Sequence, residues 1–194
     1  MMATSNSPRE FAVAQPTRDP RFVIVPIVAL PSILGFGAIL LVGSKGPAPL
    51  PMGAIVLGGI IFVAVLGGMF VKLLGAVQRR RIVLADGELD VTATLYHRKL
   101  PVAAFDLGNA KVVNLDEHDE WRPRVKTNGL GMPGLQAGWF RSRNLVKLFC
   151  LLTVRRRVLV LPELGGGATL LSAERPQQLL DALRESADAS RRSG

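Results

Sequence analysis

Residues 52–71, MGAIVLGGIIFVAVLGGMFV, contain no charged side chain. A second uncharged stretch precedes them: residues 22–43, FVIVPIVALPSILGFGAILLVG, run for twenty-two residues. An α-helix rises about 1.5 Å per residue and the hydrocarbon core of a bilayer is about 30 Å thick, so either stretch is long enough to cross it. The sequence therefore predicts two transmembrane helices, over about 22–43 and 52–77, which form a hairpin spanning 22–77.

The segment between these stretches, 44–51, contains three prolines and one glycine, which end a helix and predict a tight turn. Positive residues flank the pair on its outer sides, whereas the turn has only Lys45. The flanking residues are Arg9, Arg18, Arg21, Arg79, Arg80 and Arg81. The positive-inside rule then places both chain termini in the cytoplasm and makes the lipid bilayer the first expected partner.

The composition agrees with this expectation, because 48% of the 194 residues are hydrophobic and only 20% are charged. The net charge of +9 suits an anionic partner such as lipid, nucleic acid or an acidic protein surface, and does not choose among them. Cys150 is the single cysteine, so the chain can form no internal disulfide and no cysteine-based metal cluster.

After Arg81 the pattern changes to short alternating segments separated by Gly, Asn, Asp and Pro, which is typical of strands and turns. Asp86-Gly87 predicts a hairpin turn, and Ser172 with Pro176 predicts the start of an amphipathic C-terminal helix. We expect an α+β domain over 82–186, with six or seven strands in a strongly bent sheet and the helix closing one end. The tails, 1–21 and 187–194, are predicted to be disordered.

A glycine-punctuated segment, Trp121 to Phe140, lies between the strand groups. It resembles the bacterial pleckstrin-homology-like (bPH) family, in which a membrane hairpin precedes a domain with a Lys/Arg-Thr-Asn-Gly, Pro-Gly and Gly-Trp/Tyr-Phe series. The residues that carry the resemblance are Trp121, Thr127, Asn128, Gly129, Gly131, Pro133, Gly134, Gly138 and Trp139. The family has Asn-Gly where this chain has Asn144-Leu145.

The resemblance covers roughly 82–186 and implies a PH-like β-roll with a C-terminal capping helix. It brings no catalytic residues. With the predicted hairpin it implies a location in the bacterial cytoplasmic (inner) membrane.

The sequence contains no phosphate-binding Walker loop, no dinucleotide fingerprint, no Gly-x-Ser-x-Gly elbow and no His-Glu-x-x-His. Residues 116–120, Asp-Glu-His-Asp-Glu, offer ligands for a hard cation, but consecutive residues on a strand alternate faces, so a solvated loop is the preferred interpretation. His97 is expected to be an exposed turn residue. We therefore predict no enzyme activity, no metal site, no cofactor and no nucleic-acid partner.

Two arginine clusters are candidate contacts for anionic lipid headgroups: Arg79, Arg80 and Arg81 beside the second span, and Arg155, Arg156 and Arg157 at a hairpin tip. Anionic headgroups attract cations by about 1 kcal/mol per residue near the surface. The alternative for the first cluster is topology alone, and for the second a solvated or protein-facing turn.

The preferred function is a membrane-anchored, non-catalytic interaction or scaffolding module with a cytoplasmic PH-like domain, which binds a membrane or cytoplasmic protein. A sensor of anionic phospholipid headgroups is the first alternative. A small membrane enzyme or transporter accessory subunit is the second.

Overall fold

The computed structural model describes residues 8–16, 26, 29–35, 37–38, 41 and 51–193. The chain divides into two compact units: Pro20–Gln78 forms one, and Met1–Asp19 together with Arg79–Gly194 forms the other, called the β unit below. In the first unit, helix α2 (Met52–Gln78) is 27 residues long. A Cβ placed on Gly35 would lie 3.3 Å from the Phe62 ring of this helix, so the two segments touch.

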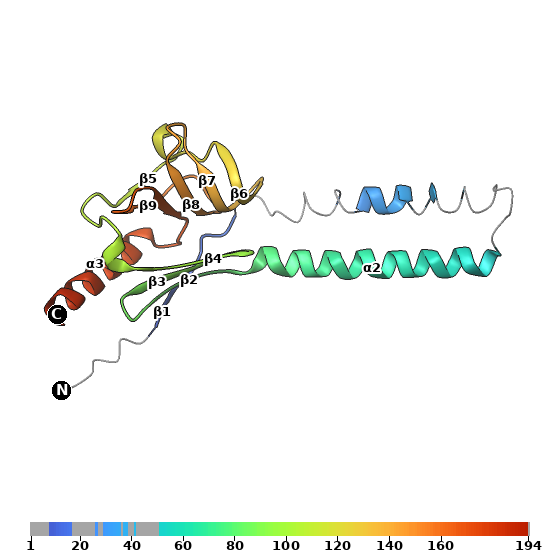
Figure 1. Cartoon of the computed structure of the whole chain (residues 1–194), viewed down its shortest axis with the longest axis horizontal. Helices are drawn as coiled ribbons and strands as arrows, with labels where there is room; N and C mark the ends of the chain where they lie inside the picture. Colours follow the sequence, from blue (N-terminus) through green and yellow to red (C-terminus); the bar gives the residue numbers. More distant parts are fainter. Residues whose placement is uncertain are drawn as a thin grey trace. The chain divides into compact units, whose positions relative to one another are not determined.

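The described part of the β unit has two sheets, of four and six strands (Figure 1). The first has the order β1-β2-β3-β4 and the second β5-β9-β10-β8-β7-β6. The strands are β1 (Arg9–Phe11), β2 (Arg80–Ala85), β3 (Glu88–Ala93), β4 (Tyr96–Pro101), β5 (Lys111–Val113), β6 (Val125–Met132), β7 (Leu135–Arg141), β8 (Lys147–Leu152), β9 (Val158–Pro162) and β10 (Ala168–Leu171).

The four-stranded sheet follows the alternation of its sequence. Ile82 and Leu84 on β2 are buried, as are Leu89 and Val91 on β3, whereas the residues between them are more exposed. Asp86 and Gly87 connect the two strands with φ angles of 52° and 74°. A tight two-residue hairpin turn requires positive φ angles at both turn residues, and Asp-Gly adopts them readily. The predicted hairpin is therefore confirmed.

The six-stranded sheet is buried on both faces at its centre. In β8, Leu148, Phe149, Cys150 and Leu151 have no exposed surface, although successive side chains point to opposite faces. Burial raises the pKa of the Cys150 thiol, because the charged thiolate would lose its hydration. β10 pairs in parallel with β8 and antiparallel with β9.

One face of this sheet is covered by residues 114–124, called the strap below. A hydrophobic cluster lies under it, with Trp121 and Val146 packed on the outside. The cluster contains Val113, Leu115, Phe140, Leu148, Cys150, Leu152, Val158, Val160, Ala168 and Leu170. The strap includes the 3-10 turn η2 (Asp119–Trp121), where the sequence predicted only a solvated loop.

Helix α3 (Pro176–Ser193) closes the end of the β unit and packs against β9 and the 3-10 turn η1 (Val102–Ala104) (Figure 1). Leu179, Leu180 and Leu183 form its buried face. The predicted disordered tail at 187–194 is wrong over its described residues, because the helix continues through Ser193. Its last turns are exposed and held by local contacts such as the hydrogen bond from Ser190 to the Ser186 carbonyl, 3.0 Å.

The prediction of a disordered tail over 1–21 is also wrong for residues 9–14. β1 pairs antiparallel with β2, Val13 forms a bridge with Ala173, and the Ala14 amide donates to the Ser172 carbonyl over 2.8 Å. Arg9 adds an ion pair of 2.6 Å with Glu185 of α3. This short segment is ordered because its backbone groups complete the edge of a sheet, which composition does not reveal.

The predicted transmembrane hairpin is not supported. Among the described residues, no helix combines the length and the apolar character that crossing a bilayer requires. The predicted turn at 44–51 lies outside the described residues, apart from Pro51.

The predicted fold class is therefore wrong. Instead of a transmembrane hairpin followed by a single bent sheet, the described residues form two sheets of four and six strands with helices. The multi-pass location in the bacterial cytoplasmic membrane depended on that hairpin and is corrected with it.

Candidate functional site

The segment that carries the family resemblance forms a hairpin, β6–β7, at the edge of the six-stranded sheet. Pro133 and Gly134 are the two turn residues between Met132 and Leu135, and Gly134 has a φ of 81°. Proline followed by a glycine of positive φ is the signature of a type II turn. Pro133 and Gly134 therefore have a structural role, because they form the turn between β6 and β7.

Two other glycines of the segment admit aromatic rings. A Cβ on Gly129 would lie 2.9 Å from the Phe140 ring, and a Cβ on Gly138 would lie 2.8 Å from the Tyr96 ring and 2.8 Å from the Asn128 carbonyl oxygen. Gly138 also has a φ of 99°, which L side chains rarely adopt. Close to Gly138 the Thr127 hydroxyl donates to the Trp139 carbonyl over 3.1 Å, beside the bulge between Lys126 and Asn128.

Replacing Gly138 with alanine is expected to destabilise the β unit by more than about 1 kcal/mol, because the new methyl group meets backbone atoms at a positive φ. Equilibrium urea unfolding of the full chain, followed by the fluorescence of its two tryptophans, measures the change. Gly165→Ala is the matched control, since a Cβ there meets nothing within 4 Å. Equal effects of the two substitutions would contradict the assignment.

The loop after β7 contains Asn144-Leu145, the position where the sequence differs from the Asn-Gly of the family pattern. Leu145 has a φ of 59°, in the left-handed region that glycine adopts without strain, and its side chain is 63% exposed. The loop is closed by hydrogen bonds from the Ser142 amide to the Val146 carbonyl, 3.0 Å, and from the Leu145 amide to the Ser142 carbonyl, 3.1 Å. Leu145 thus adopts the left-handed backbone conformation at the position where the family pattern has glycine.

Trp139 lies in a charged network that sequence analysis missed. Its ring packs edge-on against Phe149, with 5.1 Å between the centroids, and the Arg98 guanidinium lies 4.6 Å from the Trp139 centroid. Arg98 also forms two hydrogen bonds to the Glu163 carboxylate, of 2.6 and 2.8 Å. The Thr169 hydroxyl completes the network by donating to Glu163 over 2.9 Å.

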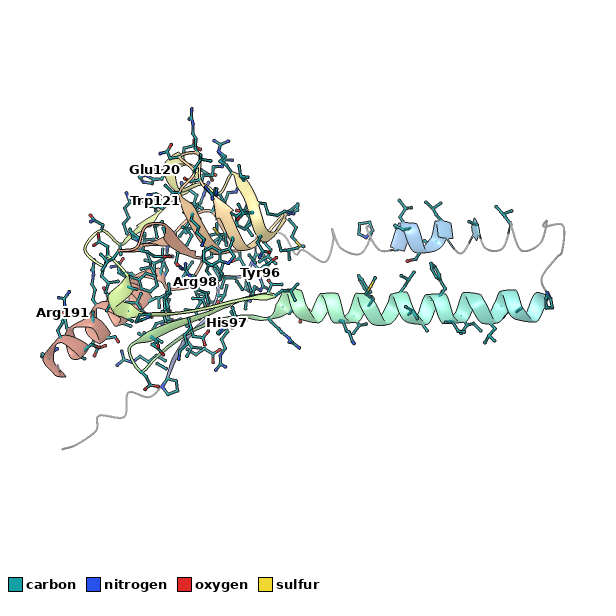
Figure 2. All side chains as sticks on the ribbon, viewed as in Figure 1. Tyr96, His97, Arg98, Glu120, Trp121 and Arg191 are labelled. Carbon is teal, nitrogen blue, oxygen red and sulfur yellow. The ribbon has the colours of Figure 1, made fainter. Side chains whose placement is uncertain are left out.

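This network joins the two sheets, because Arg98 is on β4 and Thr169 on β10, and Figure 2 shows Arg98 and Tyr96 on the side of β4 that faces the other sheet. The side chains of Arg98 and Glu163 are only 18% and 12% exposed. A signal for Arg98 existed in the sequence: it is in phase with Leu100 on the same strand, so it shares that residue's inward face. We call this network of Arg98, Glu163, Thr169 and Trp139 the clasp, because its interactions connect the two sheets.

Trp121 anchors the strap (Figure 2). It packs on the hydrophobic cluster, and its indole Nε1 is a buried donor without a hydrogen-bond partner among the described residues. Leu115, at the other end of the strap, is buried and its amide donates to the Arg155 carbonyl over 2.9 Å. The acidic residues between these anchors therefore stay at the surface.

The first arginine cluster is divided by the strand that carries it. Arg80 and Arg81 are consecutive on β2, so their side chains point to opposite faces. Arg81 is engaged by Glu10 of β1 through hydrogen bonds of 2.8 and 3.0 Å, which raise its pKa. Arg79 lies just before the strand. Arg80 therefore lies on the opposite face from Arg81, so the three arginine side chains do not share one face.

The second arginine cluster and the family-motif segment meet, which the sequence did not predict. Arg155 and Arg156 follow β8, and together with Gly131, Pro133 and Gly134 they line an open groove of about 1030 Å³. Its other lining residues are Asp116, Met132, Leu135, Gln136, Leu152, Thr153 and Val154. Arg157 is also exposed and has a φ of 58°, as part of the turn into β9.

The groove combines apolar and basic surface. Met132 and Val154 keep partly exposed apolar surface on its floor, above the buried Leu135 and Leu152. Arg155 and Arg156 are exposed at its rim. The single acidic residue of the lining, Asp116, lies 3.6 Å from the Arg155 guanidinium. An apolar floor with a few charged groups at the rim is the usual composition of a binding site.

The other polar candidates have partners at the surface. His97 is on β4, in an ion-pair arrangement of 2.8 Å with Asp90 of β3, and 58% of its side chain is exposed. Among the described residues no group of three or more His, Cys, Asp or Glu is placed to hold a metal ion. No protein-family model matches the chain, and neither a curated protein nor a solved structure is significantly similar to it.

Proposed function

We propose that this chain is a non-catalytic interaction module that binds an acidic, partly apolar segment of a partner protein. The observation that carries the proposal is the groove between the β6–β7 turn and the loop after β8, where two exposed arginines border an apolar floor. Aspartate or glutamate of the partner would pair with the arginines, while an apolar side chain next to it would contact the floor.

The resemblance to the bPH family stays a proposal, and it agrees with a binding role because it brings no catalytic residues. The motif residues support this role indirectly. Their glycines and Pro133 shape the hairpin that forms one wall of the groove, and Trp139 belongs to the clasp between the sheets.

The test uses short random peptides displayed on phage, selected on the full chain. We expect the selected peptides to combine Asp or Glu with apolar residues. Arg155→Glu with Arg156→Glu should weaken their affinity by about tenfold or more, because two attractive pairs become repulsive. Fluorescence anisotropy with a labelled peptide measures the dissociation constant.

Arg191→Glu with Arg192→Glu is the matched control, because it changes the net charge equally at exposed positions on α3. An equal loss of affinity in both double variants would mean that the loss comes from the net charge of the protein. That result would contradict binding in the groove. Failure to enrich any peptide, together with Arg155- and Arg156-dependent binding to phosphatidylglycerol vesicles, would favour the headgroup alternative.

A further inference from the structure

Strand β6 offers an open edge beside the groove. It ends the order of the six-stranded sheet among the described residues, and Val125, Lys126, Thr127 and Asn128 are exposed on both of its faces. Met132 and Leu135 close the two-residue turn, and hydrogen-bonded pairs alternate with non-bonded pairs along an antiparallel ladder. The backbone groups of Gly129 and Gly131 therefore point away from β7, toward the open side.

A further basic cluster, formed by Arg122, Arg124 and Arg143, lies where β6 begins. Three arginines surround the carboxylate of Asp119: Arg124 at 2.7 Å, Arg143 at 3.7 Å and Arg122 at 3.8 Å. Three positive charges against one negative charge leave an excess of two. The cluster has a fixed backbone, because the Arg124 amide donates to the Arg141 carbonyl over 2.9 Å and Trp121 is packed beside it.

The groove lies at the opposite end of the same strand, since Gly131 and Met132 are among its lining residues. β6 has 8 residues, and a strand rises about 3.3 Å per residue, so its first and last residues are about 23 Å apart along the edge. An open edge with positive charge at both ends is complementary to an extended chain with acidic residues at both ends.

We propose that the partner segment pairs with β6 as an additional strand, with one acidic group in the groove and another at Arg122, Arg124 and Arg143. This inference rests on the proposed function and adds the binding mode. The peptide would use the open backbone groups of Gly129 and Gly131. Lys126 is exposed on this strand, and its charge favours an acidic neighbouring strand over an uncharged or basic one.

In this binding mode, Asp119 competes with the partner's carboxylate for the arginines. Its carboxylate already occupies the arginines that a ligand carboxylate would use, and its 42% exposed side chain leaves it replaceable. Exposed ion pairs contribute only about 0.2–1 kcal/mol each, so exchange of one carboxylate for another is nearly balanced.

The experiment compares a long selected peptide, able to span β6, with a truncated version that covers only the groove. Arg122→Glu with Arg124→Glu should weaken the long peptide about tenfold and leave the short peptide unchanged, whereas Arg155→Glu with Arg156→Glu should weaken both. Asp119→Asn should strengthen the long peptide by about two- to fivefold and not the short one. The α3 double variant serves again as the charge-matched control.

Hydrogen exchange adds a readout of strand pairing: the long peptide should protect the β6 segment of the full chain, and the short peptide should not. If both peptides depend only on Arg155 and Arg156 and neither protects β6, the added strand is wrong while the groove stands. If neither peptide responds to Arg155 and Arg156, the proposed function itself fails. Weaker binding after Asp119→Asn would show that Asp119 supports the site instead of competing for it.

Discussion

Phe149→Ala is expected to lower the free energy of unfolding of the β unit by about 3–5 kcal/mol. Phe149 has no exposed surface, and its ring contacts Trp139 edge-on at 5.1 Å between centroids. Removing the ring leaves a cavity at the contact between the two sheets, in addition to the lost transfer free energy. Urea unfolding of the full chain, followed by tryptophan fluorescence, measures the difference.

Leu164→Ala is the control for this substitution, because Leu164 is 71% exposed and its truncation should change stability by less than about 0.5 kcal/mol. A small loss in Phe149→Ala, similar to that of the control, would mean that the sheets do not pack through this residue. A changed denaturant slope would instead indicate a change in the compactness of the denatured or the native state, or a loss of two-state unfolding.

Arg98→Ala is expected to destabilise the β unit by about 2–4 kcal/mol. Removing one partner of a buried ion pair typically costs about 3–5 kcal/mol, because the other charge stays buried without compensation. The residual exposure of Arg98 and Glu163, 18% and 12%, reduces that figure. Loss of the contact between the guanidinium and the Trp139 ring, at 4.6 Å, acts in the same direction.

A double-mutant cycle identifies the source of this effect. Arg98→Met with Glu163→Leu should recover most of the stability lost in either single variant, because apolar residues of similar size remove both charges together. Additive losses in the double variant would show that each side chain acts through packing alone, and the pair would then not be a clasp.

The local structure of the β unit was largely predictable because it depends on period and turn chemistry. Leu89 and Val91 alternate with polar residues, and Asp86-Gly87 supplies two positive φ angles, so strand and turn follow from neighbouring residues. Contacts distant in sequence were not predictable. Arg98 and Glu163 are 65 residues apart, and nothing in either neighbourhood indicates the other.

The candidate site was predicted in parts. Arg155 and Arg156 and the Pro133-Gly134 turn were identified separately, and the pairing of β7 with β8 brings them to one groove. Arg122, Arg124 and Arg143 were missed as a cluster, because only the strap and the loop after β7 place them around Asp119. The transmembrane prediction is contradicted, because no helix among the described residues is both long and apolar enough to cross a bilayer.

The β unit is discontinuous in the chain, since residues 9–14 belong to it and Pro20–Gln78 is inserted between β1 and β2. The bridge from Val13 to Ala173 therefore joins the N-terminal segment that carries β1 to the last connection before α3. During synthesis, β1 can pair with β2 as soon as residue 85 has been made, whereas the bridge from Val13 to Ala173 has to wait for nearly the whole polypeptide. We expect this late, long-range closure to be a slow final step of folding that cannot begin before the C-terminal segment has emerged.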